Sequence, residues 1–188
     1  IIENSVKLFL SARDEWWREE GEAQGRSYPL CLGACGPYGA YLADGSEYRG
    51  NYGVSDDVLR DFHYRREQIL WNAGADLLLF ETMPSLNEVK ICAEIAEELG
   101  ADYWISFSCK DGEHINEGDR IEDCARSLSS GYPHLRMIGV NCSKPEYIES
   151  LIRELKKATD LLRRLFAYAV VAAAFSGFMG ARVEMACL

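Results

Sequence analysis

Short apolar runs alternate four times with segments of helical periodicity, and this alternation is the feature that most constrains the fold. The runs cover residues 30–35, 75–80, 103–108 and 136–141, and Gly, Pro or polar residues bound them as they bound buried strands. Strands that alternate with helices form a parallel sheet with right-handed crossovers, so the sequence predicts an α/β fold. An open doubly wound sheet and a barrel both satisfy the pattern. The 188 residues are too few for a complete barrel, which needs about 250.

Charge is distributed unevenly along the chain. There are 20 Lys and Arg residues against 30 Asp and Glu residues, which gives a formal net charge of −10. Residues 161–188 hold three arginines and one acid, a net charge of +2, so residues 1–160 carry −12. An acidic surface repels phosphate backbones, and we expect no nucleic-acid partner. The change in charge places a boundary between residues 1–160 and a divergent tail, 161–188.

The seven cysteines indicate a reducing compartment. Their number is odd and the sequence shows no secretory leader, which together favour free thiols and a cytoplasmic protein. A free cysteine in such a protein is by default a small buried hydrophobic residue, and a metal ligand or nucleophile is the less common case.

Candidate functional residues follow the predicted strands, because parallel α/β folds collect their working side chains at the carboxyl ends of strands. Tyr38 follows the first strand, Glu81 the second, and Asn141 with Cys142 the fourth. No dinucleotide fingerprint or P-loop is present. The three histidines, His63, His114 and His134, are scattered and are expected at the surface.

Position alone leaves two interpretations of Glu81 and of Cys142. Glu81 either binds an amine or acts as a base at the strand tip, or it caps a helix or pairs with an arginine. Cys142 is either a zinc ligand or a packed thiol, and no second cysteine stands near it at metal-binding spacing.

Five segments in the same order resemble the homocysteine S-methyltransferases that use S-methylmethionine or S-adenosylmethionine as methyl donor. The longest is the Tyr- and Gly-rich segment 33–53, which contains Gly-Pro-Tyr-Gly-Ala-Tyr-Leu-Ala-Asp-Gly-Ser-Glu-Tyr. The others are Ala-Gly-Ala-Asp-Leu-Leu at 73–78, Glu-Thr-Met-Pro at 81–84, Trp-Ile-Ser-Phe-Ser at 104–108 and Gly-Val-Asn-Cys at 139–142. The resemblance runs from about residue 3 to Asp160.

The resemblance implies a (β/α)8 barrel of the TIM type, of which this chain covers about units three to six. It implies one zinc ion held by three cysteines, with Cys142 as the first, and homocysteine bound through its sulfur. It places Glu81 at the amino group of homocysteine, and Asn141 and Tyr38 in the barrel mouth. The sequence contains no Gly-Gly-Cys-Cys segment for the other two ligands, and Cys187 lacks the context of one. We therefore expect weak or no zinc binding and no turnover by this chain alone.

Two features keep alternatives open. The tail 161–188 fits a frame-shifted or misjoined end best. The other interpretations are a membrane anchor at 165–181 and a barrel strand at 167–174. Residues 165–181 carry no charge, but this run is marginal in length for a membrane span. The alternative function is a non-catalytic half-barrel module for binding or interaction. Such a module would self-associate through its exposed sheet edges.

Overall fold

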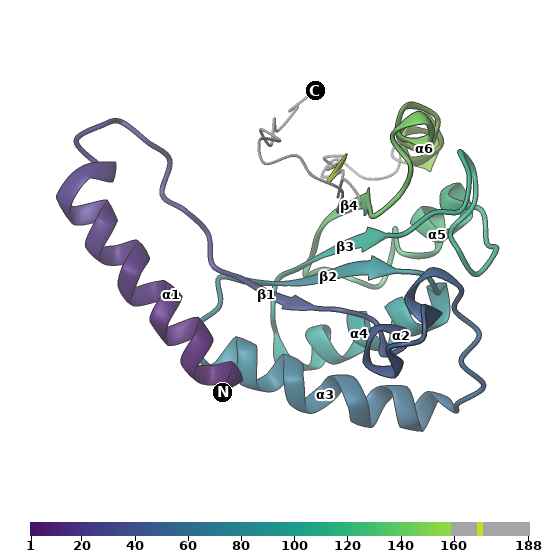
Figure 1. Ribbon diagram of the computed structural model, residues 1–188, viewed down its shortest axis with the longest axis horizontal. Helices are drawn as coiled ribbons and strands as arrows, with labels where there is room; N and C mark the ends of the chain where they lie inside the picture. The colour runs from purple at the N-terminus through teal and green to yellow at the C-terminus, as the bar shows by residue number, and fades with distance from the viewer. Residues whose placement is uncertain (159–168, 171–188) are drawn as a thin grey trace.

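A parallel sheet of five strands forms the centre of the protein in the computed structural model, which describes residues 1–158 and the strand at 169–170 (Figure 1). The strands are β1 (Leu32–Cys35), β2 (Leu77–Met83), β3 (Tyr103–Phe107), β4 (Leu135–Asn141) and β5 (Ala169–Val170). They lie in the sheet in the order in which they occur in the chain, and every neighbouring pair is parallel. The predicted α/β class is confirmed.

The strand order distinguishes between the two architectures that the sequence leaves open. Right-handed crossovers between sequential parallel strands place all of the connecting helices on one face, which is the arrangement of a barrel and not of a doubly wound sheet. The connecting helices are α3 (Asp56–Asn72), α4 (Leu86–Leu99), α5 (Ile121–Ser127) and α6 (Pro145–Ala158). The chain therefore has the fold of part of a TIM-type barrel.

The register divides the sheet into a helix-facing side and an opposite side. Cys35, Phe80, Ile105 and Ile138 lie side by side in register, and all four are buried in the main hydrophobic core. The row one residue earlier consists of Ala34, Leu79, Trp104 and Met137, and its members are exposed or only partly buried. Strands that are apolar throughout predict a sheet with both faces buried. In the part of the chain that the structure describes, only the face that meets the helices is buried along all four strands β1 to β4.

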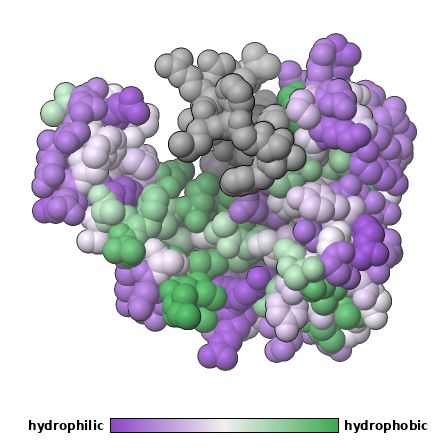
Figure 2. All heavy atoms as spheres, in the orientation of Figure 1, coloured by the Kyte–Doolittle hydropathy of each residue, from purple (hydrophilic) through white to green (hydrophobic). Residues whose placement is uncertain are grey.

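The first helix, α1 (Ile2–Trp16), extends away from the sheet and continues into a π-helical turn at Trp17–Gly21 (Figure 1). Val6 is buried in the core and Leu10 packs against it, whereas Leu8 is 73% exposed. Figure 2 shows hydrophobic surface in the hollow between α1 and the rest of the molecule. Within the described part of the chain, no helix is both long enough and apolar enough to cross a membrane.

Helix α3 buries polar as well as apolar side chains. Val58 is 43% exposed, and Leu59 and Leu70 share the buried face with His63 and Glu67. Ser55 precedes α3 and makes no capping bond through its side chain. His63 is completely buried, so the prediction that it lies at the surface is wrong.

The predicted tail lies outside the described residues, apart from β5. This applies to Cys187 and to most of the candidate membrane segment 165–181. Strand β5 pairs with the end of β4 and falls within the stretch 167–174, for which a barrel strand is one of the interpretations.

Candidate functional site

A group of three polar side chains joins the carboxyl ends of β2 and β4. The Asn141 side chain receives a hydrogen bond from the Thr82 backbone N–H at 2.8 Å and donates one through Nδ2 to the Thr82 hydroxyl at 2.9 Å. Asn141 is 2% exposed, so the two bonds satisfy both ends of a buried amide. Because β3 lies between β2 and β4 in the sheet, this pair of bonds ties together strands that are not neighbours.

Cys142 completes this group, which we call the Thr82–Cys142 cluster (Thr82, Asn141 and Cys142). The Thr82 hydroxyl donates to the Cys142 sulfur at 3.3 Å, and Asn141 Nδ2 lies 3.6 Å from the same atom. Tyr48 lies near this sulfur, and partial burial together with the proximity of Cys142 raises the pKa of Tyr48. The Thr82 hydroxyl and the Asn141 amide therefore both face the sulfur.

Two left-handed residues shape the cluster. Thr82 has φ of 61° and Cys142 has φ of 48°. Such values are uncommon outside glycine, and for the β-branched threonine they are a strained conformation. The Thr82 strain coincides with a register shift between β2 and β3 from Phe80 to Met83. The hydrogen bonds to Asn141 and Cys142 hold Thr82 in this conformation.

Glu81 immediately precedes the cluster at the end of β2. Strand alternation places it on the same face as Leu79, opposite the helix-facing Phe80. Burial raises the pKa of the Glu81 carboxyl. Among the described residues it makes no hydrogen bond or ion pair, so the interpretation as a helix cap or arginine partner finds no support there. The Glu81 side chain is partly buried.

Tyr38 lies apart from the cluster. Its ring packs edge-on against Phe62, with centroids 5.0 Å apart, and contacts Tyr41 and Tyr52. None of its contacts within residues 1–158 involves Thr82, Asn141 or Cys142. Tyr48 from the same Tyr- and Gly-rich segment reaches the Cys142 sulfur instead.

A buried carboxylate anchors that segment to the helices. Glu88, at the start of α4, accepts hydrogen bonds from the Tyr38 backbone N–H at 2.5 Å and from the Tyr52 hydroxyl at 2.9 Å. Its Oε1 also lies 2.8 Å from His63 Nε2. The Ser85 hydroxyl accepts a hydrogen bond from the Glu88 N–H and so caps α4, while the Glu88 side chain turns to the loop and makes no return bond to Ser85.

Two serines near the end of β3 differ in their hydrogen bonding. The Ser108 hydroxyl receives a bond from Asn116 Nδ2 at 2.9 Å, and it lies 3.3 Å from the Thr82 carbonyl oxygen. Ser106 is 4% exposed and lies beside Gly139 of β4, and its hydroxyl has no hydrogen-bond partner among the described residues. A buried hydroxyl without a partner is uncommon in folded proteins.

The metal-binding capacity of the cluster is limited to one thiol. Cys142 is partly exposed, while Cys31, Cys35, Cys92, Cys109 and Cys124 are buried. No set of three metal-ligating side chains in the described part of the chain includes Cys142. These residues fit one ligand of a zinc site and do not complete it.

Sequential parallel strands with polar residues at their carboxyl ends define the class of protein, a segment of a TIM-type barrel whose candidate site lies at those ends. The family profile described as homocysteine S-methyltransferase matches residues 1–182. The chain belongs to the homocysteine S-methyltransferase family.

Individual relatives agree with this assignment. The chain is 48% identical over 161 residues to homocysteine S-methyltransferase YbgG of Bacillus subtilis, covering 85% of this chain and 51% of that protein. It is 44% identical over 165 residues to homocysteine S-methyltransferase 1 of Arabidopsis thaliana, covering 85% and 50%. The metallated form of the homocysteine methyltransferase MmuM from Escherichia coli superimposes with a TM-score of 0.80 at 38% identity, covering 89% of this chain and 57% of that one. The chain spans about half the length of the curated relatives it matches.

Proposed function

We propose that this chain supplies the homocysteine-binding part of a methyltransferase that forms methionine from homocysteine and a sulfonium donor, S-methylmethionine or S-adenosylmethionine. The observation that carries the proposal is the convergence of Glu81 and the Thr82–Cys142 cluster at the carboxyl ends of β2 and β4. The family membership and the relatives' names support the substrate class.

The residues have distinct roles in this proposal. Cys142 serves as one thiolate ligand of a zinc ion, and zinc when bound lowers the pKa of a coordinated thiol so that a thiolate exists at neutral pH. Glu81 pairs with the amino group of homocysteine, since a half-buried carboxyl without a partner gains most from an adjacent cation. Asn141 and Thr82 orient the Cys142 sulfur through their hydrogen bonds. Tyr38 packs against Phe62 in the structure, so a role in the barrel mouth would require its ring to move away from Phe62.

The zinc site needs further ligands beyond the described residues. We propose that the chain alone binds zinc weakly through Cys142 and shows no turnover. We also propose a cytoplasmic location, which the free thiols of the described cysteines support.

Calorimetric titration of L-homocysteine into the protein, in the presence of Zn2+, tests the proposal. Glu81→Gln removes the charge with little change in shape and should weaken binding at least about tenfold, because it removes a charged hydrogen bond. Glu98→Gln is the matched control, an exposed glutamate on α4 that pairs with Arg60. Equal binding by the wild-type protein and Glu81→Gln would remove Glu81 from the site, and methionine formation by this chain alone would contradict the proposed lack of turnover.

A second candidate function is self-association. Strand β1 is an edge of the sheet, and its neighbouring segment exposes Leu30 at 50%. A sheet edge without a partner offers backbone groups to another chain. Light scattering after size exclusion would show a defined dimer if this module pairs with itself, whereas a monomer at micromolar concentration would exclude it.

A further inference from the structure

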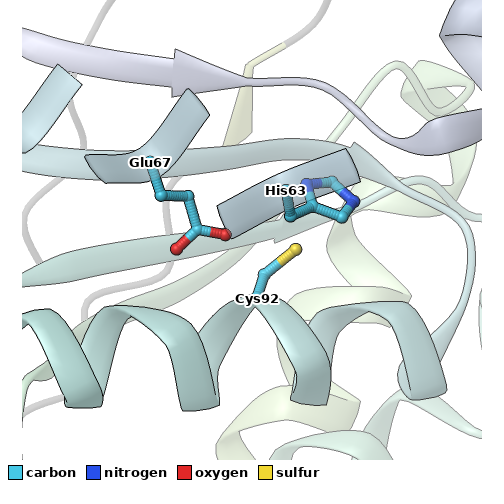
Figure 3. A group of neighbouring side chains, drawn as sticks. All are labelled: His63, Glu67 and Cys92. Carbon is cyan, nitrogen blue, oxygen red and sulfur yellow. The ribbon is translucent and has the colours of Figure 1, made fainter. Parts of the chain in front are cut away.

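A second set of metal-ligating side chains lies between α3 and α4, away from the strand ends. It consists of His63, Glu67 and Cys92, and Figure 3 shows the Glu67 carboxylate and the Cys92 sulfur directed into the space between the two helices. His63 and Glu67 are four residues apart on α3 and so share one face of that helix. All three side chains are fully buried. We call this group the His63–Cys92 cluster.

Glu67 is the member of this cluster that most needs an explanation. Neither carboxylate oxygen has a hydrogen-bond partner among the described residues. Burial raises the pKa of Glu67 well above its ordinary value, and the nearby Arg66 guanidinium and Cys92 thiol offset only part of the rise. Native structures rarely bury an unpartnered carboxyl group, and when they do, an ion is one of its usual companions.

His63 is oriented as histidine ligands are. Arg66 Nη2 lies 3.0 Å from His63 Nδ1, and an arginine can only donate, so Nδ1 is the acceptor and Nε2 carries the proton. That proton points to Glu88 Oε1 at 2.8 Å. A metal-bound histidine almost always donates its second N–H to a carboxylate or carbonyl, and this leaves Nδ1 as the ligand atom. A metal would displace Arg66 from Nδ1, and the same Arg66 nitrogen would keep its bond to the Gly36 carbonyl oxygen, 3.2 Å away.

We propose that His63, Glu67 and Cys92 form a buried structural site for a divalent ion of the zinc class. One ligand atom from each side chain, with either ring nitrogen counted for His63, lies within 4.8 Å of the other two. An ion bound at about 2.0–2.3 Å by each of them would place them about 3.3–3.8 Å apart, so the donors need to close by about 1 Å. The mixed nitrogen, oxygen and sulfur set suits zinc, and the two anionic ligands balance its charge. Structural zinc sites take four donors, so both Glu67 oxygens, which have no other partner among the described residues, would bind the ion. Arg66 and Glu88 flank the cluster with opposite charges.

Because the site has no exposed atom, the metal must enter while the chain folds. The protein is therefore unfolded in guanidinium with a chelator and refolded with Co2+ or Zn2+. The parent for all measurements is Cys142→Ser, so that the Thr82–Cys142 cluster contributes no ligand. We expect about one zinc per refolded chain by elemental analysis, and a thiolate-to-cobalt charge-transfer band for the Co2+ form.

Variants separate a metal site from a merely packed cluster. Glu67→Gln has nearly the same shape, so a packing role would leave it unchanged, whereas the proposal expects a loss of metal affinity of at least about tenfold. Cys92→Ser should abolish the charge-transfer band, and Cys124→Ser, which changes an equally buried thiol on α5, should retain it. A parent protein that refolds with its native circular dichroism but binds neither ion would overturn the proposal, as would Glu67→Gln with undiminished metal content. These results do not depend on homocysteine binding.

Discussion

The Glu88 carboxylate is the most sensitive single point in the described structure for stability. It accepts from the Tyr38 N–H, the Tyr52 hydroxyl and His63 Nε2, and it is itself completely buried. Glu88→Ala would leave these three donors without their acceptor. Each buried donor without a partner costs about 1–3 kcal/mol, and Tyr52 is only partly buried, so its share is at the lower end. We expect a loss of about 3–5 kcal/mol in the free energy of unfolding.

Urea denaturation followed by tryptophan fluorescence measures this loss. With a slope of about 2 kcal/mol per molar urea, the midpoint should fall by about 1.5–2.5 M. Glu88→Gln keeps one carbonyl oxygen as acceptor and should lose about half as much. The free energy of unfolding of a domain is only about 5–15 kcal/mol, so Glu88→Ala can fail to fold. The milder variant Glu88→Gln then still allows the loss to be measured.

Glu98→Ala is the control for this series. It removes an exposed glutamate from the same helix, and its surface ion pair with Arg60 is worth less than about 1 kcal/mol. If Glu88→Ala unfolds within about 1 kcal/mol of the wild-type protein, the three hydrogen bonds do not anchor the loop as described.

Three further predictions concern other parts of the molecule. Thr82→Val should cost about 1–3 kcal/mol in thermal unfolding because Asn141 loses its hydroxyl partner, while Thr82→Ser, which keeps the hydroxyl, should cost less than half of that; equal losses would show that the hydroxyl does not stabilise the cluster. The hydrogen bond from Arg136 lowers the pKa of Asp102, with a smaller contribution from His134, so its stabilisation is present above about pH 4 and lost as pH falls through the lowered pKa. Asp102→Asn should therefore be less stable than the wild-type protein by less than about 1 kcal/mol at pH 7 and equal to it near pH 2, as chemical denaturation would show; a constant difference would refute this. Iodoacetamide should modify Cys142 before the five buried thiols, as peptide mass mapping would show. The reason is that only the thiolate reacts, and burial raises the pKa of Cys35, Cys109 and Cys124 to about 12 in each case. Early labelling at any of these three would contradict the described burial.

The sequence predicts the strands and helices well because each strand is a short apolar run closed by Gly, Pro or a polar residue. It could not choose between a doubly wound sheet and a barrel, since both have the same local pattern and differ only in which strands are neighbours. The resemblance supplied the barrel, and the sequential order β1 to β5 agrees with it.

The candidate site was predictable only in part. Glu81, Asn141 and Cys142 stand directly at strand ends, where the chain itself marks them. Thr82 and Tyr48 lie close to Cys142 in space but about 60 and 94 residues before it in the sequence. A local sequence pattern cannot predict contacts over such separations. His63 was misplaced because an apolar pattern assigns the buried face of a helix by its hydrophobic residues, and here His63 and Glu67 are buried on that face as well.

The sequential order of the strands has a consequence for how the molecule comes apart. Nearly all contacts between elements join a strand or helix to the next one along the chain, as in β1 with β2, α3 with α4 and α5 with α6. Such a molecule behaves like a short solenoid, in which stability is a sum of unit terms and nearest-neighbour interfaces. Unfolding can then begin at either outer unit and proceed inward. Strands β2 and β3 have neighbouring units on both sides and are therefore the last to unfold. The bond between Thr82 and Asn141 is an exception, because it joins units that are not adjacent and makes their opening cooperative.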